Sequence, residues 1–160
     1  MIINEFLVRN LNQTLGMLKM TLADMSDADL MQRPAAGANH GNWQIGHLIV
    51  SETHLVGKCG VKMPELPAGF AERYTKETAK SDDASKCLSK AELLEQFEKT
   101  RAATIAFANS ATEAELEAVS PMPQLCPKVA DVVGLASGHI WMHLGQIQVL
   151  RRKLGKPILF

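Results

Sequence analysis

The stretch Gly138-His139-Ile140-Trp141-Met142-His143-Leu144-Gly145-Gln146-Ile147 holds two histidines four positions apart in an otherwise apolar segment. Residues four apart on an α-helix share one face, with their Cβ atoms about 5–6 Å apart. Two imidazoles placed in this way can bind one metal ion, or they can be buried histidines that hydrogen bonds satisfy. A third ligand elsewhere in the chain would distinguish the two interpretations.

Apolar residues recur with helical spacing in this stretch and in three other parts of the chain. The four predicted helices cover about residues 2–24, 42–58, 89–108 and 129–154. No strand pattern of comparable strength is present. The segment Val61–Leu88 has little periodicity and is too long for a tight turn, which indicates a crossover that lets the second and third helices run parallel. The predicted fold is all-α: a four-helix bundle with a long crossover between helices 2 and 3, in one domain over residues 1–160.

Capping sequences support these helix positions. Ser89 and Glu92 form a capping box at the start of the third helix, and a second box at Thr112 predicts only a short helix. Ser26 is a good N-cap for another short helix, and Asn42 is the expected N-cap of the second long helix.

Composition excludes several classes of protein. The 160 residues carry 17 basic and 17 acidic side chains without a long block of either sign, which argues against binding to nucleic acid or to a membrane surface. No apolar run approaches the length of a membrane span. The three cysteines form no Cys-x-x-Cys motif, and the N-terminal residues resemble a helix start rather than a leader, so we expect free thiols and a cytoplasmic location.

The second predicted helix carries the candidates for a third ligand. His47 and His54 both fall on its apolar stripe, as His139 and His143 fall on that of the fourth helix. Seven residues of helix rise about 10.5 Å, so one ion near the pair can take only one of these two histidines. His40 lies in a predicted loop and is expected to be solvated. Four inward histidines favour a metal site over hydrogen-bonded core histidines.

Two segments resemble a known family: Asn42-Trp43-Gln44-Ile45-Gly46-His47-Leu48, and His139-x-x-x-His143-x-Gly145-Gln146-Ile147 with the following Leu150-Arg151-Arg152-x-Leu154-Gly155-Lys156-Pro157. They are similar to the DinB-like family of metal-dependent bundle proteins. The resemblance implies a four-helix bundle with a three-histidine site for a divalent metal ion, whose ligands here would be His47, His139 and His143. His54 and Gln146 could then lie around these ligands or face a substrate. The resemblance also implies a homodimer, formed through outward apolar positions.

A three-histidine site leaves a divalent ion with its full charge and an open position, the layout of a catalytic centre. Such an ion could activate water or a thiol. The resemblance implies a small-molecule substrate: some similar proteins are S-transferases or isomerases that use low-molecular-weight thiols. A hydrolase is a further interpretation. The ligand type permits zinc, nickel, iron or manganese, and ligands that are all nitrogen favour the later metals of this series. The alternative is a non-catalytic metal-binding or stress-response bundle. No further catalytic residue is predicted, and Glu52 is interpreted as a solvated carboxylate.

Overall fold

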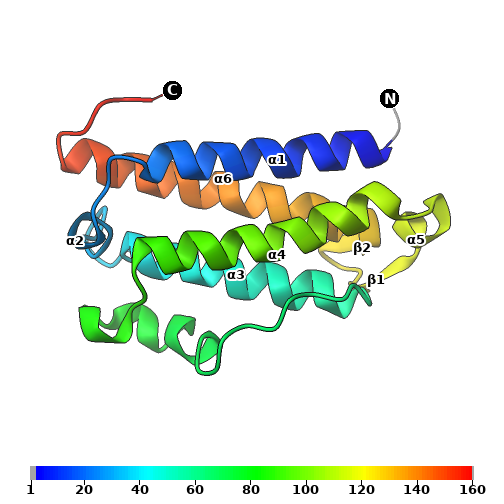
Figure 1. Ribbon diagram of the computed structural model, residues 1–160, viewed down its shortest axis with the longest axis horizontal. Coiled ribbons are helices and arrows are strands. Elements are labelled where there is room, and N and C mark those ends of the chain that lie inside the picture. The colour runs from blue at the N-terminus through cyan, green and yellow to red at the C-terminus, as the bar shows by residue number, and fades with distance from the viewer. Residues whose placement is uncertain (1–2, 160) are drawn as a thin grey trace.

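The computed structural model describes residues 3–159 and shows a bundle of four long helices (Figure 1). These are α1 (Ile3–Leu22), α3 (Gly41–Lys58), α4 (Lys90–Ser110) and α6 (Val129–Lys153). Helix α1 packs against α4 and α6, and α3 packs against the same two helices. In Figure 1, α3 and α4 run in one direction and α1 and α6 in the other. The predicted bundle with a crossover between its second and third long helices is therefore confirmed.

Local capping accounts for most helix starts. The Ser89 side chain accepts a hydrogen bond from the Glu92 amide while the Glu92 carboxylate accepts one from the Ser89 amide, which is the predicted capping box of α4. The same arrangement at Thr112 opens the short α5 (Glu113–Glu117), and at Ser26 it opens the short α2 (Asp27–Leu30). The first predicted helix included residue 2, which lies outside the described residues.

The start of α3 differs from the prediction. Its N-cap is His40, whose Nδ1 accepts a hydrogen bond of 3.1 Å from the Trp43 amide. His40 is buried, so the expectation that it is solvated was wrong. Asn42 is buried too, and its side-chain amide donates to the Leu88 carbonyl at 2.6 Å, so it ties α3 to the start of α4 instead of capping the helix.

A small antiparallel hairpin joins α5 to α6. Its strands are β1 (Val119–Met122) and β2 (Cys126–Lys128). The sequence did not predict it because strands of three and four residues are too short to show an alternating pattern, and each contains a proline, which usually argues against a strand.

The crossover is fastened to α3 by Tyr74. The crossover contains three 3-10 turns, η1 (Ala71–Tyr74), η2 (Thr78–Lys80) and η3 (Ala84–Lys86). The Tyr74 ring lies so close to Gly46 that a Cβ there would be only 2.3 Å from it. The Tyr74 hydroxyl donates to Asn42 at 3.4 Å and accepts from the Leu88 amide at 3.2 Å. Gly46 is therefore needed for the crossover to lie against the half of α3 that carries His47.

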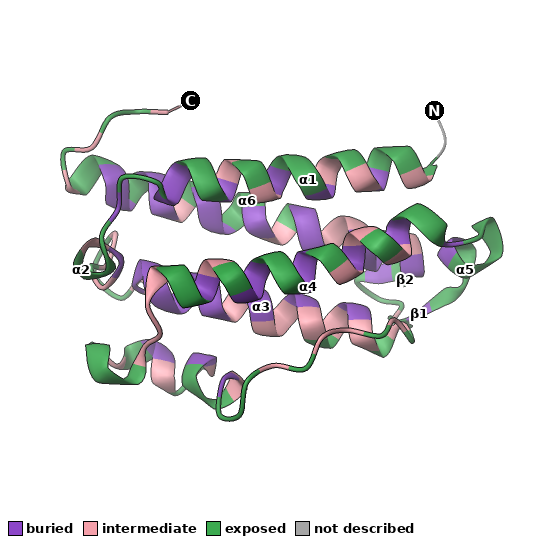
Figure 2. Ribbon diagram, viewed as in Figure 1, coloured by how far each residue is buried: buried purple, intermediate pink, exposed green. Residues whose placement is uncertain are grey.

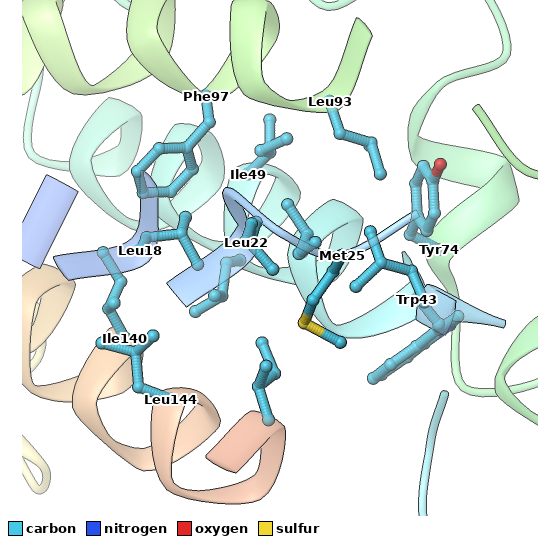
Figure 3. Packing of buried hydrophobic residues seen from close by; sticks show 14 of the residues in the cluster. Leu18, Leu22, Met25, Trp43, Ile49, Tyr74, Leu93, Phe97, Ile140 and Leu144 are labelled. Carbon is cyan, nitrogen blue, oxygen red and sulfur yellow. The ribbon is translucent and has the colours of Figure 1, made fainter. Parts of the chain in front are cut away.

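Apolar side chains from all four long helices fill the interior. Figure 2 shows the buried faces turned toward one another, and Figure 3 shows side chains of α1, α3, α4 and α6 meeting in one cluster. The cluster includes Leu18, Leu22, Ile49, Phe97, Ile140 and Leu144. None of the helices within residues 3–159 combines the length and the apolar character that a membrane span requires.

A buried ion pair links all four long helices. Arg101 of α4 is fully buried, and its guanidinium contacts Glu52 of α3 at 2.7 Å and 2.9 Å. The same guanidinium donates to the Leu11 carbonyl of α1 at 2.9 Å and to the Ala136 carbonyl of α6 at 3.2 Å. Thr104 donates a further hydrogen bond of 2.7 Å to Glu52. Each charged group thus has several partners, which is the condition for burying it at tolerable cost. The interpretation of Glu52 as a solvated carboxylate was wrong.

Candidate metal centre

Three histidines converge between α3 and α6. His47 comes from α3, and His139 and His143 come from successive turns of α6. One ring nitrogen of each lies within 4.8 Å of the others. The Nε2 atoms of His139 and His143 are 3.1 Å apart. Two ligand nitrogens of a tetrahedral zinc ion, each about 2.05 Å from it, lie about 3.3 Å apart. The α6 pair is therefore spaced for one ion, and a small adjustment would bring His47 to it.

Gln44 orients His143. Its side-chain oxygen lies 2.9 Å from Nδ1 of His143, and its side-chain nitrogen donates to the Asn39 carbonyl at 2.8 Å. Because an amide oxygen only accepts, Nδ1 of His143 carries the proton, and the lone pair on Nε2 faces the other two histidines. This is the usual support for a metal-binding imidazole. The sequence pattern did not single out Gln44, although its place one turn before His47 on the same helix could have indicated it.

Trp43 holds the ring of His47. The two rings are stacked, with centroids 4.7 Å apart and planes 7° from parallel. The indole nitrogen of Trp43 donates to the Thr75 carbonyl of the crossover at 2.9 Å, which fixes the indole in turn. The centroid of the His47 ring is then 5.1 Å from that of His139 and 5.5 Å from that of His143.

Burial keeps the three imidazoles neutral. Burial, followed by the nearby His139, lowers the pKa of His47 to about 4. Burial lowers the pKa of His143 to about 3, with smaller contributions from His139 and His47, and burial alone lowers the pKa of His139. A neutral imidazole has a free lone pair, so near pH 7 all three side chains are in the form that binds metal.

The lowered pKa values predict that the metal-free protein loses stability on mild acidification. Free histidine titrates near pH 6.5, so between that pH and about 4 the unfolded chain binds more protons than the folded one. The contribution of these histidines to stability is therefore constant above about pH 7 and falls as the pH decreases through this window. Thermal unfolding of metal-free protein is expected to show a melting temperature about 5 °C or more lower at pH 5 than at pH 7.5.

The matched control removes one histidine of the group. His143→Gln should reduce the difference in melting temperature between the two pH values, because the variant lacks an imidazole whose pKa is lowered by burial. Equal pH dependence in the wild-type protein and in His143→Gln would contradict the assignment of this effect to the three histidines. A lower limit of pH 5 keeps the measurement above the range in which carboxylates titrate.

The sequence also singled out His54 and Gln146. His54 is exposed near the end of α3, so the expectation that it points inward was wrong. Packed helices cross at an angle, and a helix face that is covered at one turn can be uncovered two turns further along. Gln146 is half-buried on α6. Among the described residues the amide that contacts the histidines is that of Gln44, and a role for Gln146 or His54 near the site stays a prediction.

The fold and this group define a class: four-helix bundles with three histidines placed to share a metal ion between the second and fourth long helices. The model of the DinB superfamily matches residues 10–147, and the chain belongs to this superfamily. No curated protein matches it.

Two solved structures share the fold. YfiT from Bacillus subtilis, described as a probable metal-dependent hydrolase with an unusual four-helix bundle topology, has a TM-score of 0.70 at 17% sequence identity, over 96% of this chain and 89% of YfiT. A conserved protein from Enterococcus faecalis has a TM-score of 0.70 at 18% identity, over 98% of this chain and 99% of that protein. At such identities the similarity establishes the fold.

Proposed function

We propose that this protein is a divalent-metal-dependent enzyme in which His47, His139 and His143 hold the ion. The observation that supports this proposal most directly is the composition of the group. It consists of three neutral imidazoles, and within residues 3–159 no carboxylate or thiolate joins them. Structural zinc sites are closed by a fourth protein ligand, whereas catalytic sites leave that position to water or substrate. Zinc, nickel and iron suit imidazole ligands, and manganese, which usually prefers oxygen ligands, completes the set of metals to be tested.

An ion bound here would lower the pKa of a water molecule or a thiol that occupies its open position. The pairing of the nearby carboxylate favours the thiol over water. Hydrolysis profits from a general base within hydrogen-bond reach of the water. Glu52, the buried carboxylate of α3, is instead paired with Arg101 and Thr104. A thiol that binds a metal ion loses its proton without such a base. We therefore place S-transfer from a low-molecular-weight thiol first, and hydrolysis, the activity named for YfiT, second.

The test uses tag-free protein, stripped of metal and reloaded with one equivalent of zinc, nickel, iron or manganese. Each form is assayed for conjugation of cysteine, glutathione or 2-mercaptoethanol to 1-chloro-2,4-dinitrobenzene, in which the sulfur–carbon bond forms and chloride leaves. Hydrolysis of 4-nitrophenyl acetate is assayed in parallel. S-transferase activity that depends on metal and is lost in His143→Ala would support the first function, and hydrolysis alone would support the second.

A non-catalytic bundle, in which the ion only holds α3 and α6 together, is the competing function. A structure of the metal-loaded protein distinguishes it, since a fourth protein ligand would close the site and an exchangeable water or thiol would leave it open. A closed site with no activity in either assay would favour the binding or stress-response protein.

We also propose a cytoplasmic homodimer. Large apolar side chains are exposed on the two parallel helices α1 and α6, among them Phe6, Met20, Trp141, Met142 and Val149. Burying such side chains between two copies would stabilise a dimer. Light scattering at micromolar concentration is expected to give twice the mass of the 17.5 kDa chain, and a monomer would refute this part of the proposal.

A further inference from the structure

Ser51 lies one turn after His47 on α3, on the side that faces the histidine group. Its hydroxyl oxygen is 3.4 Å from Nε2 of His47, and the side chain is half-buried. A serine within a helix commonly bonds to a carbonyl of its own preceding turn. In the described part of the chain, the partner of the Ser51 hydroxyl is this imidazole nitrogen instead.

The ring nitrogens that meet on α6 are Nε2 atoms. The Nε2 atoms of His139 and His143 face each other, and the Nδ1 atom of His143 is occupied by Gln44. The proposed centre is therefore built from Nε2 atoms on α6, and we assign the ligand atom of His47 to its Nε2 as well, which is the nitrogen that Ser51 contacts. When that nitrogen gives its lone pair to an ion, it has neither a proton nor a lone pair left for the hydroxyl.

We infer that Ser51 is a fourth protein group of this centre: its hydroxyl faces the open coordination position and hydrogen-bonds to the molecule that binds there. The inference rests on the proposed metal site. A neutral hydroxyl is not among the usual ligands of such ions, so Ser51 would not close the site. A hydroxyl donates a strong, charge-assisted hydrogen bond to an anion. Ser51 therefore selects for an anion, such as a deprotonated thiol, as the occupant of the open position.

The first test replaces the hydroxyl by a group that binds the ion directly. Metal-free wild-type protein, Ser51→Cys and Thr53→Cys each receive one equivalent of Co²⁺, and bound cobalt is measured together with the absorption spectrum. A thiolate that coordinates Co²⁺ adds an intense charge-transfer band in the near ultraviolet. Thr53 is the matched control because it is also half-buried on α3, but its hydroxyl faces Thr100 of α4 at 3.4 Å.

The band is expected in Ser51→Cys and in neither of the other two proteins. Ser51→Cys that binds one Co²⁺ without the band would overturn the inference and leave the proposed metal site standing. Wild-type protein that binds no Co²⁺ would overturn both, so the two failures are distinguishable.

The second test measures how much the Ser51 hydroxyl contributes to the binding of an anion. Azide is titrated into the Co²⁺ forms of the wild-type protein, Ser51→Ala and Ser51→Thr, and its binding is followed in the visible spectrum. Loss of one charge-assisted hydrogen bond is expected to weaken azide binding about tenfold or more in Ser51→Ala. Ser51→Thr keeps a hydroxyl and should restore most of the affinity. Equal affinity of Ser51→Ala and wild type for azide would overturn the assigned role.

Discussion

Substitution of His47 by alanine is expected to abolish stoichiometric metal binding, whereas His54→Ala should leave it nearly intact. His47 is the member of the histidine group that α3 supplies, and its ring centroid lies 5.1 Å from that of His139. Without it, only the two histidines of α6 remain, and these cannot hold the ion between two helices. His54 is exposed on the same helix, so it is a control of the same residue type.

Metal content of tag-free protein and calorimetric titration with Zn²⁺ measure this effect. Gln44→Ala should give an intermediate result, with zinc affinity about 10–100-fold weaker, because it removes the partner of His143 and no ligand. All variants should keep their helical circular dichroism, since apolar side chains of all four helices form the core. Loss of metal in His54→Ala with retention in His47→Ala would refute the ligand assignment, and retention in both would refute the site.

Arg101→Met is expected to cause the largest loss of stability of any single substitution proposed for this chain. The change leaves the Glu52 carboxylate buried without its positive partner, which typically costs about 3–5 kcal/mol. For a chain of this length, that corresponds to a melting temperature lower by about 6–20 °C. Because Arg101 also bonds to the Ala136 carbonyl, one turn before His139, the variant should bind metal more weakly as well.

Two controls separate the buried charge from other effects. The double variant Glu52→Leu/Arg101→Met removes both charges and should recover most of the lost stability, since well-packed apolar side chains often replace a buried pair at little cost. Lys99→Ala breaks the exposed pair of Lys99 with Glu95 on the same helix and should cost about 1 kcal/mol or less. Urea unfolding of the four proteins measures these differences. A loss in Arg101→Met no larger than in Lys99→Ala would contradict the role assigned to the pair.

Features that depend on residues near one another in the sequence were predictable. The capping box at Ser89 and the helical spacing of apolar residues located the long helices, because these signals act within a few residues. The unpatterned segment before Ser89 predicted the crossover, and with it the parallel course of α3 and α4. The spacing of His139 and His143 placed both imidazoles on one face of α6.

Features that depend on what lies opposite a side chain were decided by the tertiary structure. His47 and His54 have nearly the same bearing on α3, yet His47 joins the histidine group and His54 is exposed. The partner that lets Glu52 be buried is Arg101, 49 residues away, and no local pattern connects them. Gln44 and His143 are 99 residues apart and meet only when α3 packs against α6. Local periodicity and capping thus determined the helices and the histidine pair, whereas long-range packing decided which polar side chains surround it, because the burial and pairing of a charge depend on atoms from distant parts of the chain.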